Sequence, residues 1–457
     1  MKVRQLVFSL LVIFVLVLSA CTPAQQPTEA QQPQPEATQP SAEQPAPAGK
    51  TAITFWHAMS GSREEVIKGI ADRFNQSQDQ YTVTPEYTGS YAETLTKALA
   101  AYRSGTAPTI VQVYEVGTRS MLDSGAVVPV HTLNKGEVDW NDVVQPIMKY
   151  YSVDGNLYCM PFNSSTAMLY YNKDMFEAAG LDPNTPPTTW AQVEEYSLKI
   201  MEETDATGGF SMGWPAWILE QMYAVHNELM ANNENGRSGL ATEVYLNNEF
   251  GVKVLTEWQR MADEGVLVYG GREYAANDPF LAKQFPFLFQ STSSLGGIMK
   301  AADFEVGTAF LPRFEGDYEQ GNSVVGGGCL WLMNKATPEQ QAGSWEFFKF
   351  INSMDETIAW HKGTGYFPAT NSAYEKLKAD GWFTEEPNHA TAFDQILGGA
   401  DTPAASGVLL GDFVRIRDIV GAAIEEAVVN DVDPQQALDK ATEEANQVLK
   451  DYESLNK

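Results

Sequence analysis

Five short segments of the sequence carry groups that could do chemistry: GSYAETL, QVYEVGT, the glycines 326–328, TGYFPAT and RIRDIV. Each presents hydroxyls, backbone amides or one fixed charge. Such groups can hold a small polar ligand through hydrogen bonds. None of the segments pairs a nucleophile with a general base, as covalent catalysis requires. The pattern therefore indicates ligand binding without catalysis.

Other chemistry is not indicated elsewhere in the sequence. The five histidines show no metal-ligand spacing, and no G-x-S-x-G turn that would present a catalytic serine occurs. A surface hydrolase using paired carboxylates among the 59 acidic residues stays open as an alternative, although no pair has a telling spacing. We predict no catalytic residue, no metal and no cofactor.

The first residues have the pattern of an export signal. Lys2 and Arg4 precede an apolar run that ends on LSAC, which is similar to the box at which bacterial lipoproteins are cut and acylated. We therefore predict a signal peptide at residues 1–20 and an acylated Cys21. Residues 21–50 are rich in Pro, Gln and Ala and have no aromatic or branched aliphatic residue, which predicts a disordered tether. The protein would be exported and lipid-anchored on the outer face of the cytoplasmic membrane, at the cell surface or in the periplasm.

Composition limits the partners and the domain count. The chain has 30 basic and 59 acidic residues and a formal net charge of -29. That balance disfavours nucleic acid, which would need a basic face, and anionic lipid. The stretch after the tether exceeds what one hydrophobic core usually supports, which predicts two lobes.

The cysteines leave one structural question open. Besides Cys21 the sequence has only Cys159 and Cys329, so an oxidising compartment has not produced a disulfide framework. These two can pair, but two separate buried thiols are at least as good an interpretation, because the geometry of a pair is not readable from the sequence.

Strand and helix patterns alternate near the start of the folded part. TAITFWHA, YTVTPEY and TIVQVY have strand patterns. Ser62 and Glu65 predict a capping box that opens one helix, and residues 91–102 have helical spacing. In folds of this type ligands sit on loops beyond the carboxyl ends of strands, and Tyr91 and Glu115 fall at such ends.

The same mixture continues to the end of the chain. NLYCMPFNSSTAMLYYN predicts a strand pair, residues 189–265 are helix-rich, and FPFLFQSTSS, EVGTAFLPR and GGGCLWLMN are strand-like. Pro338 begins a helix, and Asp433 with Pro434 starts the last one. We find no internal repeat. The fold class predicted from this order is mixed α/β.

These segments, in this order, resemble the extracellular solute-binding proteins, family 1, of ABC importers, which include the maltose-binding type. LYYNKDMFEAAGLDP and PPTTW are general to that family, while FWHAMSG, VQVYEVGT, PFNSSTAMLYYN and HKGTGYFPAT are similar to its glycerol-3-phosphate-binding branch. The resemblance implies a type II periplasmic-binding-protein-like fold, in which each of two lobes is a mixed sheet flanked by helices and the ligand cleft lies at the hinge. We expect lobe 1 at residues 51–159 plus 297–346, and lobe 2 at 160–296 plus 347–457.

The resemblance also implies a function and a ligand set. The function is capture of sn-glycerol-3-phosphate, or a glycerophosphodiester, by a monomer that delivers it to permease subunits in the membrane. The ligand contacts, carried over by motif, fall on Tyr91, Glu115, Ser165, Ser291, Gly327, Tyr366 and Arg417. Two positions depart from the pattern. The STSS run leaves open whether Ser291, Thr292 or Ser293 takes the place of the matching serine. Leu409 stands where a close relative has a basic residue, which would either weaken phosphate attraction or change the preferred headgroup.

Charge predicts a polarised pocket. Arg417 would hold the phosphate, and Glu115 would accept hydrogen bonds from glycerol at the far end, because it would repel a phosphate beside it. Without the resemblance, Arg417 beside Asp418 is more typical of a solvated ion pair. A receptor for neutral sugars is the alternative, favoured by the ten tryptophans and disfavoured by Arg417. Trp214 and Trp217 could stack on a sugar, but we do not include them in the site.

Overall fold

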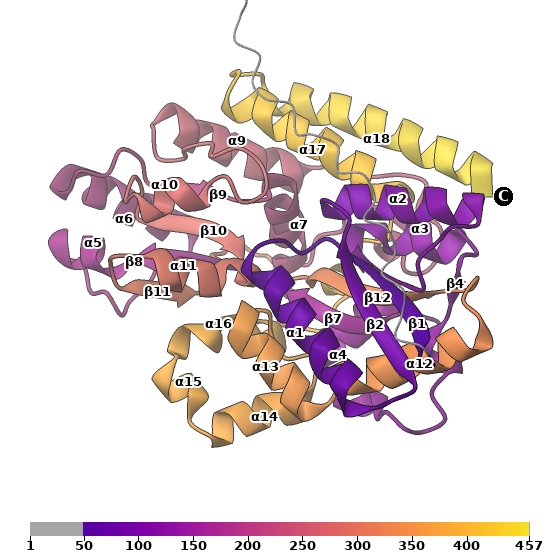
Figure 1. The fold of residues 1–457 in the computed structure, drawn as a ribbon. Helices are drawn as coiled ribbons and strands as arrows, with labels where there is room; N and C mark the ends of the chain where they lie inside the picture. Colours follow the sequence, from indigo (N-terminus) through magenta and orange to yellow (C-terminus); the bar gives the residue numbers. More distant parts are fainter. Residues whose placement is uncertain (1–48, 457) are drawn as a thin grey trace, which may run out of the picture. The chain divides into compact units, whose positions relative to one another are not determined.

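The computed structural model describes residues 49–456 and contains two mixed β-sheets, one in each of two lobes (Figure 1). The predicted signal peptide, the acylated Cys21 and all but the last two residues of the predicted tether lie outside the described residues. Within residues 49–456, no helix has the length and apolar character needed to cross a membrane. No cluster of His, Cys, Asp and Glu in the same range is arranged to hold a metal ion.

The sheet of the first lobe has six strands, in the order β2-β1-β3-β12-β4 with β7 paired to β12. β1 is parallel to β2 and β3, and β12 is antiparallel to β3, β4 and β7. All five residues of the central β3 are buried. The strands are β1 (Thr51–His57), β2 (Tyr81–Tyr87), β3 (Ile110–Tyr114), β4 (Val127–Val128), β7 (Met160–Ser165) and β12 (Gly326–Met333).

The sheet of the second lobe has four strands in the order β11-β8-β10-β9. β8 is antiparallel to β10 and β11, and β10 is parallel to β9. The strands are β8 (Ala167–Asn172), β9 (Phe210–Met212), β10 (Phe287–Ser291) and β11 (Val306–Ala309). A separate hairpin joins β5 (Ser152–Val153) to β6 (Asn156–Leu157).

The strands predicted in NLYCMPFNSSTAMLYYN are present as β7 and β8, but the prediction that they form a pair is wrong. β7 belongs to the first sheet and β8 to the second. Thr166 lies between them, and its hydroxyl donates to the carbonyl of Val324 at 3.0 Å. The chain therefore passes from the first sheet to the second at this residue.

The predicted lobe boundaries stay a prediction, and the strand pairings bear on them. β7 follows residue 159 yet pairs with β12 of the first sheet, while β11 lies after residue 297 yet pairs with β8 of the second. We propose from sheet membership that the chain changes lobe at Thr166 and again between β11 and β12.

Helices cover both sheets, and α17 and α18 lie side by side across α7 and α9 (Figure 1). The longer helices are α1 (Ser62–Ser77), α2 (Tyr91–Ser104), α6 (Trp190–Glu203), α7 (Pro215–Val225), α9 (Glu249–Asp263), α12 (Pro338–Ile351), α13 (Met354–Thr364), α17 (Phe413–Val428) and α18 (Pro434–Asn456). The shorter ones are α3 (Thr118–Asp123), α4 (Gln145–Tyr151), α5 (Lys173–Ala178), α8 (Asn232–Gly236), α10 (Asn277–Leu281), α11 (Leu295–Ala301), α14 (Asn371–Ala379), α15 (Trp382–Glu385) and α16 (Thr391–Gly398). Two single 3-10 turns matter for the site: η1 (Glu115–Gly117) after β3 and η4 (Thr292–Ser294) after β10.

The capping box predicted for the first helix occurs at the second helix instead. α1 begins after Gly61, which has a φ of 62° and gives no side-chain cap, so the capping box predicted for Ser62 and Glu65 is wrong. The box occurs at α2 instead. There the Glu93 amide donates to the Ser90 hydroxyl at 3.3 Å, and the Ser90 amide donates to the Glu93 carboxylate at 2.7 Å. The cap fixes the start of α2 and with it the position of Tyr91.

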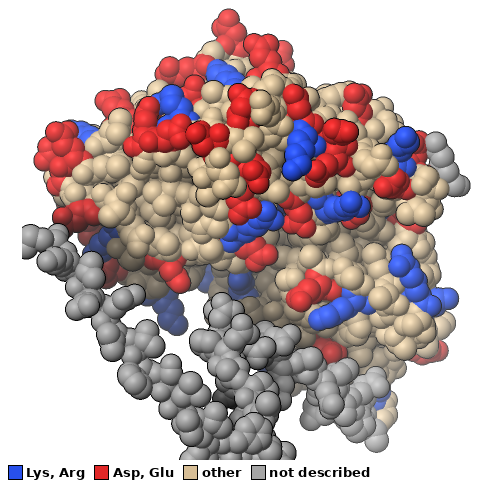
Figure 2. Space-filling model, turned by 90° about the horizontal axis from the view of Figure 1, so that it is seen from above, with Lys and Arg blue, Asp and Glu red and all other residues tan. Residues whose placement is uncertain are grey.

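The face of the molecule on the side of α17 and α18 carries both acidic and basic side chains (Figure 2). Asp and Glu side chains are spread over this face, with Lys and Arg scattered among them, and no basic area forms there. This distribution is what the net charge of -29 leads one to expect. A face of this kind favours solubility and offers nothing to a polyanion.

Cys159 and Cys329, which the sequence left open, form a disulfide. Both residues are fully buried, Cys329 in β12 and Cys159 directly before β7. The bond therefore fastens the edge strand β7 to its neighbour at a point where the ladder between Gly328 and Cys329 is irregular. It closes a loop of 170 residues.

Removal of this disulfide should destabilise the protein because a long loop in the unfolded chain is released. We expect Cys159→Ser together with Cys329→Ser to lower the free energy of unfolding by about 2–4 kcal/mol, measured by urea denaturation. Reduced wild-type protein should match the double variant. Equal stability of the oxidised wild type and the double variant would contradict the role given to the bond.

Candidate functional site

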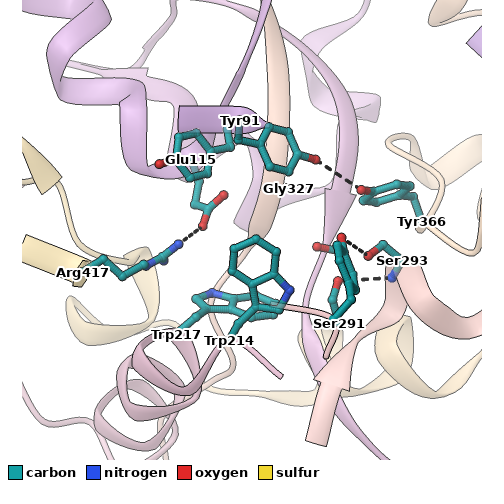
Figure 3. Close-up of a pocket in the computed structure, with 12 residues that line it drawn as sticks. Tyr91, Glu115, Trp214, Trp217, Ser291, Ser293, Gly327, Tyr366 and Arg417 are labelled. Atoms are coloured by element: carbon teal, nitrogen blue, oxygen red, sulfur yellow. Dashed lines mark hydrogen bonds and ion pairs between the residues drawn. The ribbon is translucent and has the colours of Figure 1, made fainter. Parts of the chain in front are cut away.

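A cavity between the two lobes gathers polar and aromatic side chains from both of them (Figure 3). The space that it outlines measures about 350 Å³ and includes solvent at its open side. Its lining consists of Tyr91, Tyr114, Glu115, Ser165, Trp214, Trp217, Tyr274, Ser291, Ser293, Gly327, Tyr366 and Arg417. The structure thus brings together all seven residues that the resemblance implied. That they bind a ligand stays a prediction.

The first lobe places its residues at the ends of strands. Glu115 is the first residue after β3, Ser165 is the last residue of β7, and Gly327 lies in β12. Because β12 pairs with both β3 and β7, the three residues meet at one edge of the sheet. Tyr91, the first residue of α2, stacks its ring on Tyr114 with 5.0 Å between ring centroids. Strand ends therefore form this wall, as α/β folds commonly arrange.

The glycine run is part of a strand that passes close to its neighbours. Gly327 has a φ of +88°, and a Cβ there would lie 1.8 Å from the carbonyl oxygen of Asn163. A Cβ on Gly326 would lie 2.4 Å from the ring of Trp217. Side chains are therefore excluded at both positions, and the wall at Gly327 is bare backbone that a ligand can approach closely.

The second lobe supplies the other wall. Arg417 lies on α17, next to Ile416, whose side chain is buried in the helix packing. Ser291 is the last residue of β10, so a site residue lies at the end of a strand in this lobe too. Trp214 and Trp217 stand at the start of α7, and Trp214 meets Tyr274 edge to face at 5.5 Å. Aromatic rings thus form the floor of the cavity between its two polar sides (Figure 3).

One side of the cavity is a cluster of three charges. The Arg417 guanidinium donates to Glu220 at 2.6 and 2.8 Å and to Glu115 at 2.7 Å. The side chains are only 11%, 5% and 6% exposed for Arg417, Glu220 and Glu115. One positive and two negative charges give this cluster a formal charge of about -1 when both carboxyls are ionised. It joins α17 and α7 of the second lobe to the end of β3 in the first.

Burial and pairing act against each other in this cluster. Burial raises the pKa of Glu115 above its ordinary value, and the charge of Arg417 partly offsets that rise. Burial also disfavours the charge of Arg417, but Glu220 and Glu115 outweigh it and raise the pKa of the guanidinium. Arg417 stays charged, and three of its five N–H groups are used by the carboxylates, so two remain for a ligand.

The opposite side of the cavity is rich in hydroxyls (Figure 3). The hydroxyls of Tyr91 and Tyr366 are 3.3 Å apart, and those of Tyr274 and Ser293 are also 3.3 Å apart. The Ser293 amide donates to the Ser291 hydroxyl at 3.2 Å. Burial raises the pKa of Tyr91 well above its ordinary value, so this hydroxyl keeps its proton and can donate.

A second, wider cavity adjoins the first on the Arg417 side. The space that it outlines measures about 700 Å³, including solvent at its open side, and it shares the walls made by Tyr91, Trp214 and Arg417. Glu273 and Asp418 add two carboxylates to it. Burial, and then the charge of Asp418, raises the pKa of Glu273. This space can take a group that extends beyond the first cavity, and its charge suits a cationic one.

The predicted separation of Glu115 and Arg417 is wrong. They were expected at opposite ends of the pocket, yet they form an ion pair at 2.7 Å. The solvated pair of Arg417 with Asp418, typical of such a sequence without the resemblance, is not present among residues 49–456 either. Asp418 is instead 3.7 Å from Arg272. Sequence spacing cannot show which carboxylate a buried guanidinium selects.

Other sequence-based expectations are refined by the structure. Leu409 is buried and lines a different cavity, so its apolar side chain does not form part of this wall. Ser291 and Ser293 both line the site, while the hydroxyl of Thr292 is buried without a partner. The STSS run therefore contributes two of its serines.

Sequence reasoning missed several lining residues. Tyr114 and Tyr274 were not considered, and Trp214 and Trp217 were set aside although both line the cavity. Adjacency to a recognised residue could have suggested Tyr114, which precedes Glu115. No sequence pattern indicates a role for Glu220. It lies within the apolar helix α7 and comes into contact with Arg417 only in the folded protein.

Comparison with known proteins gives matches along most of the chain. The profile of bacterial extracellular solute-binding proteins matches residues 69–391. The sn-glycerol-3-phosphate-binding periplasmic protein UgpB of Escherichia coli K12 is 35% identical over 415 residues, which cover 89% of this chain and 94% of that protein.

Solved structures confirm the two-lobed α/β fold. UgpB from Mycobacterium tuberculosis in complex with glycerophosphocholine gives a TM-score of 0.75 at 20% identity, covering 89% of this chain and 100% of that one. The cyclic α-maltosyl-1,6-maltose binding protein from Arthrobacter globiformis gives 0.72 at 21% identity, covering 88% and 100%.

The charge cluster predicts a large stability effect at Glu220. We expect Glu220→Gln to lower the free energy of unfolding by about 3–5 kcal/mol, because it removes the two-pronged partner of a buried guanidinium. Urea denaturation measures this. Glu426→Gln, an exposed change on α17, is the control and should stay within about 0.5 kcal/mol of wild type. If Glu220→Gln lowered the free energy of unfolding as little as Glu426→Gln, the stabilising role given to the charge cluster would be wrong.

Proposed function

Because this chain belongs to the family of bacterial extracellular solute-binding proteins, we propose that it captures sn-glycerol-3-phosphate, or a glycerophosphodiester, for an ABC importer. The resemblance seen in the sequence is confirmed at the level of the family. The relatives are transport proteins that bind their ligands unchanged, so this chain is a binding protein and not an enzyme. The surface-hydrolase alternative is thereby removed.

The observation that carries the proposal is the two-sided cavity. One side offers carboxylates that can accept hydrogen bonds from glycerol hydroxyls, and the other offers hydroxyl donors for phosphate oxygens. A glycerol phosphate has hydroxyls at one end and three acceptor oxygens at the other. The relative that is 35% identical is named for binding this compound, which supports the same ligand here.

The groups present can account for useful affinity. A hydrogen bond to a charged group contributes about 1.5–3 kcal/mol net. Micromolar binding requires about 8 kcal/mol. Three or four such bonds, from the hydroxyls of Tyr366 and Ser291 and from the two Arg417 N–H groups that the carboxylates leave free, would supply much of this binding free energy. Rings such as Trp214 would cover the carbon backbone of the ligand and add apolar contact.

A diester is accommodated by the wider adjoining cavity. Its additional group could occupy the space bounded by Glu273 and Asp418, where two carboxylates would stabilise a cation. The aromatic ring of Trp214 between the two cavities would favour the same kind of group.

A neutral sugar is the second candidate, and a specific observation favours it. The Arg417 charge is balanced by two carboxylates, so the cluster could serve as a set of hydrogen-bonding groups for sugar hydroxyls. Trp214 and Trp217 offer rings on which a sugar could stack. Competition between maltose and glycerol phosphate separates the two candidates.

We further propose where the protein works. The predicted signal peptide and acylated Cys21 would place it on the outer face of the cytoplasmic membrane, and the predicted tether would let a monomer reach permease subunits. Mass spectrometry of the mature N-terminus tests the anchor: a diacylglyceryl-modified Cys21 supports it, and an unmodified residue or a cut elsewhere excludes it.

Titration calorimetry tests the ligand. We expect the purified protein to bind sn-glycerol-3-phosphate with a one-to-one stoichiometry and a dissociation constant of about 1 μM or lower, because the cavity complements both ends of the molecule. Glycerophosphocholine should also give heat if the adjoining cavity is used. Heat with maltose and none with either phosphate ester would establish the sugar alternative instead.

A further inference from the structure

We propose that Arg63, together with Tyr274 and Ser293, forms the anion-binding end of this cavity and holds the phosphate group of the ligand. The inference rests on the proposed function and names the residue that supplies the positive charge. It assigns the phosphate to the side opposite Arg417, which was the cation implied by the resemblance.

Arg63 reaches the hydroxyl side of the cavity from the first turn of α1. Its Nη1 donates to the Tyr274 hydroxyl at 3.1 Å, and its guanidinium carbon is 5.1 Å from the centre of the Tyr274 ring. Tyr274 in turn is 3.3 Å from the Ser293 hydroxyl. Tyr274 and Ser293 both line the cavity. Arg63 is therefore one hydroxyl away from the ligand space.

Arg63 has a charge that no carboxylate balances. Within residues 49–456 its guanidinium donates a hydrogen bond only to the Tyr274 hydroxyl, whereas Arg73 on the same helix pairs with Glu356 at 2.6 Å. A guanidinium is not deprotonated in proteins, so Arg63 keeps its charge in the neighbourhood of Tyr366, Tyr274 and Tyr91. All three tyrosines line the cavity.

Arg417 is poorly suited to hold a phosphate. Its charge is shared by Glu115 and Glu220, and both carboxylates would stand beside an anion bound there. Two like charges about 4 Å apart repel by about 4 kcal/mol at the effective dielectric near a protein surface. Arg63 brings no such repulsion. One of its five N–H groups is engaged, so four remain for phosphate oxygens.

The chemistry of this end matches a tetrahedral oxyanion. The hydroxyls of Tyr274, Ser293 and Tyr366 can each donate one hydrogen bond, and a guanidinium can donate two in parallel. A phosphate ester presents three acceptor oxygens and one to two charges near neutral pH. The glycerol end of the same molecule then points toward Glu115, which accepts hydrogen bonds from hydroxyls.

The test compares Arg63→Gln with wild type by titration calorimetry with sn-glycerol-3-phosphate. We expect the affinity to fall by about 10- to 100-fold, because a charged donor pair is lost. Arg63→Lys should recover part of the loss, since it restores the charge but not the fork. Arg103→Gln, which removes the same charge from an exposed position on α2, is the matched control and should bind like wild type.

A second readout follows the charge of the ligand. The ester loses its second proton near pH 6, so wild-type affinity should rise between pH 5 and pH 7.5, and Arg63→Gln should flatten this rise. Thermal unfolding confirms that the variants fold. If Arg63→Gln does not fold, Tyr274→Phe provides the same test, because it removes the bridging hydroxyl and keeps the ring.

The outcomes separate this inference from the proposed function. Wild-type binding that Arg63→Gln and Tyr274→Phe leave unchanged would overturn the role of Arg63 and keep the function. Absence of wild-type binding to any phosphate ester would overturn the function itself. Inorganic phosphate as competitor shows whether the anion alone is held at this end: we expect weak competition that Arg63→Gln abolishes, and competition that persists in Arg63→Gln would overturn the assignment.

Discussion

The buried guanidinium of Arg417 is the constraint on which the site depends. A charge taken out of water must be paired, and here two carboxylates do so from separate elements, Glu220 on α7 and Glu115 at the end of β3. The pair with Glu115 crosses between the lobes. The pairing of Arg417 therefore ties α17 to α7 and to the end of β3 at this side of the cavity.

The same neutralisation decides what the cavity can accept. With about one excess negative charge on the Arg417 side, an anionic group is pushed toward the hydroxyl side and a hydroxylated or cationic group is drawn toward the carboxylates. The protein as a whole is strongly acidic, and salt screens that field beyond about 8 Å. Recognition of an anion would therefore have to come from short-range donors, and the hydroxyls of Tyr274, Ser293 and Tyr366 are the groups of this kind on the hydroxyl side.

Sequence patterns predicted most strands of the two sheets and several of the longer helices, because buried strands read as apolar runs and amphipathic helices repeat apolar residues at helical spacing. It failed where a choice depends on distant partners: β7 and β8 follow one another in sequence but pair in different sheets, and Cys159 meets Cys329 through β12. The seven site residues followed from resemblance, since a lone serine or tyrosine carries little signal. Glu220 could not be found, because its carboxylate lies 197 residues from Arg417 within an apolar helix. Arg63, in the polar run SREE, has the pattern of a solvated helix start.

Two contacts that join the lobes, Arg417 with Glu115 and Arg63 with Tyr274, would respond differently to a bound ligand. The Arg417 pair with Glu115 already joins opposite charges, so a ligand can add little there. The contact of Arg63 with Tyr274 joins a cation to a neutral phenol, so only its donor carries a charge. A phosphate between Arg63 and Tyr274 would accept from both, replacing this one bond by a bond from each lobe to an anion, of which the one from Arg63 is charged at both ends. An anionic ligand would thereby strengthen the contact between the lobes at Arg63, whereas a neutral ligand would gain no such stabilisation from this residue.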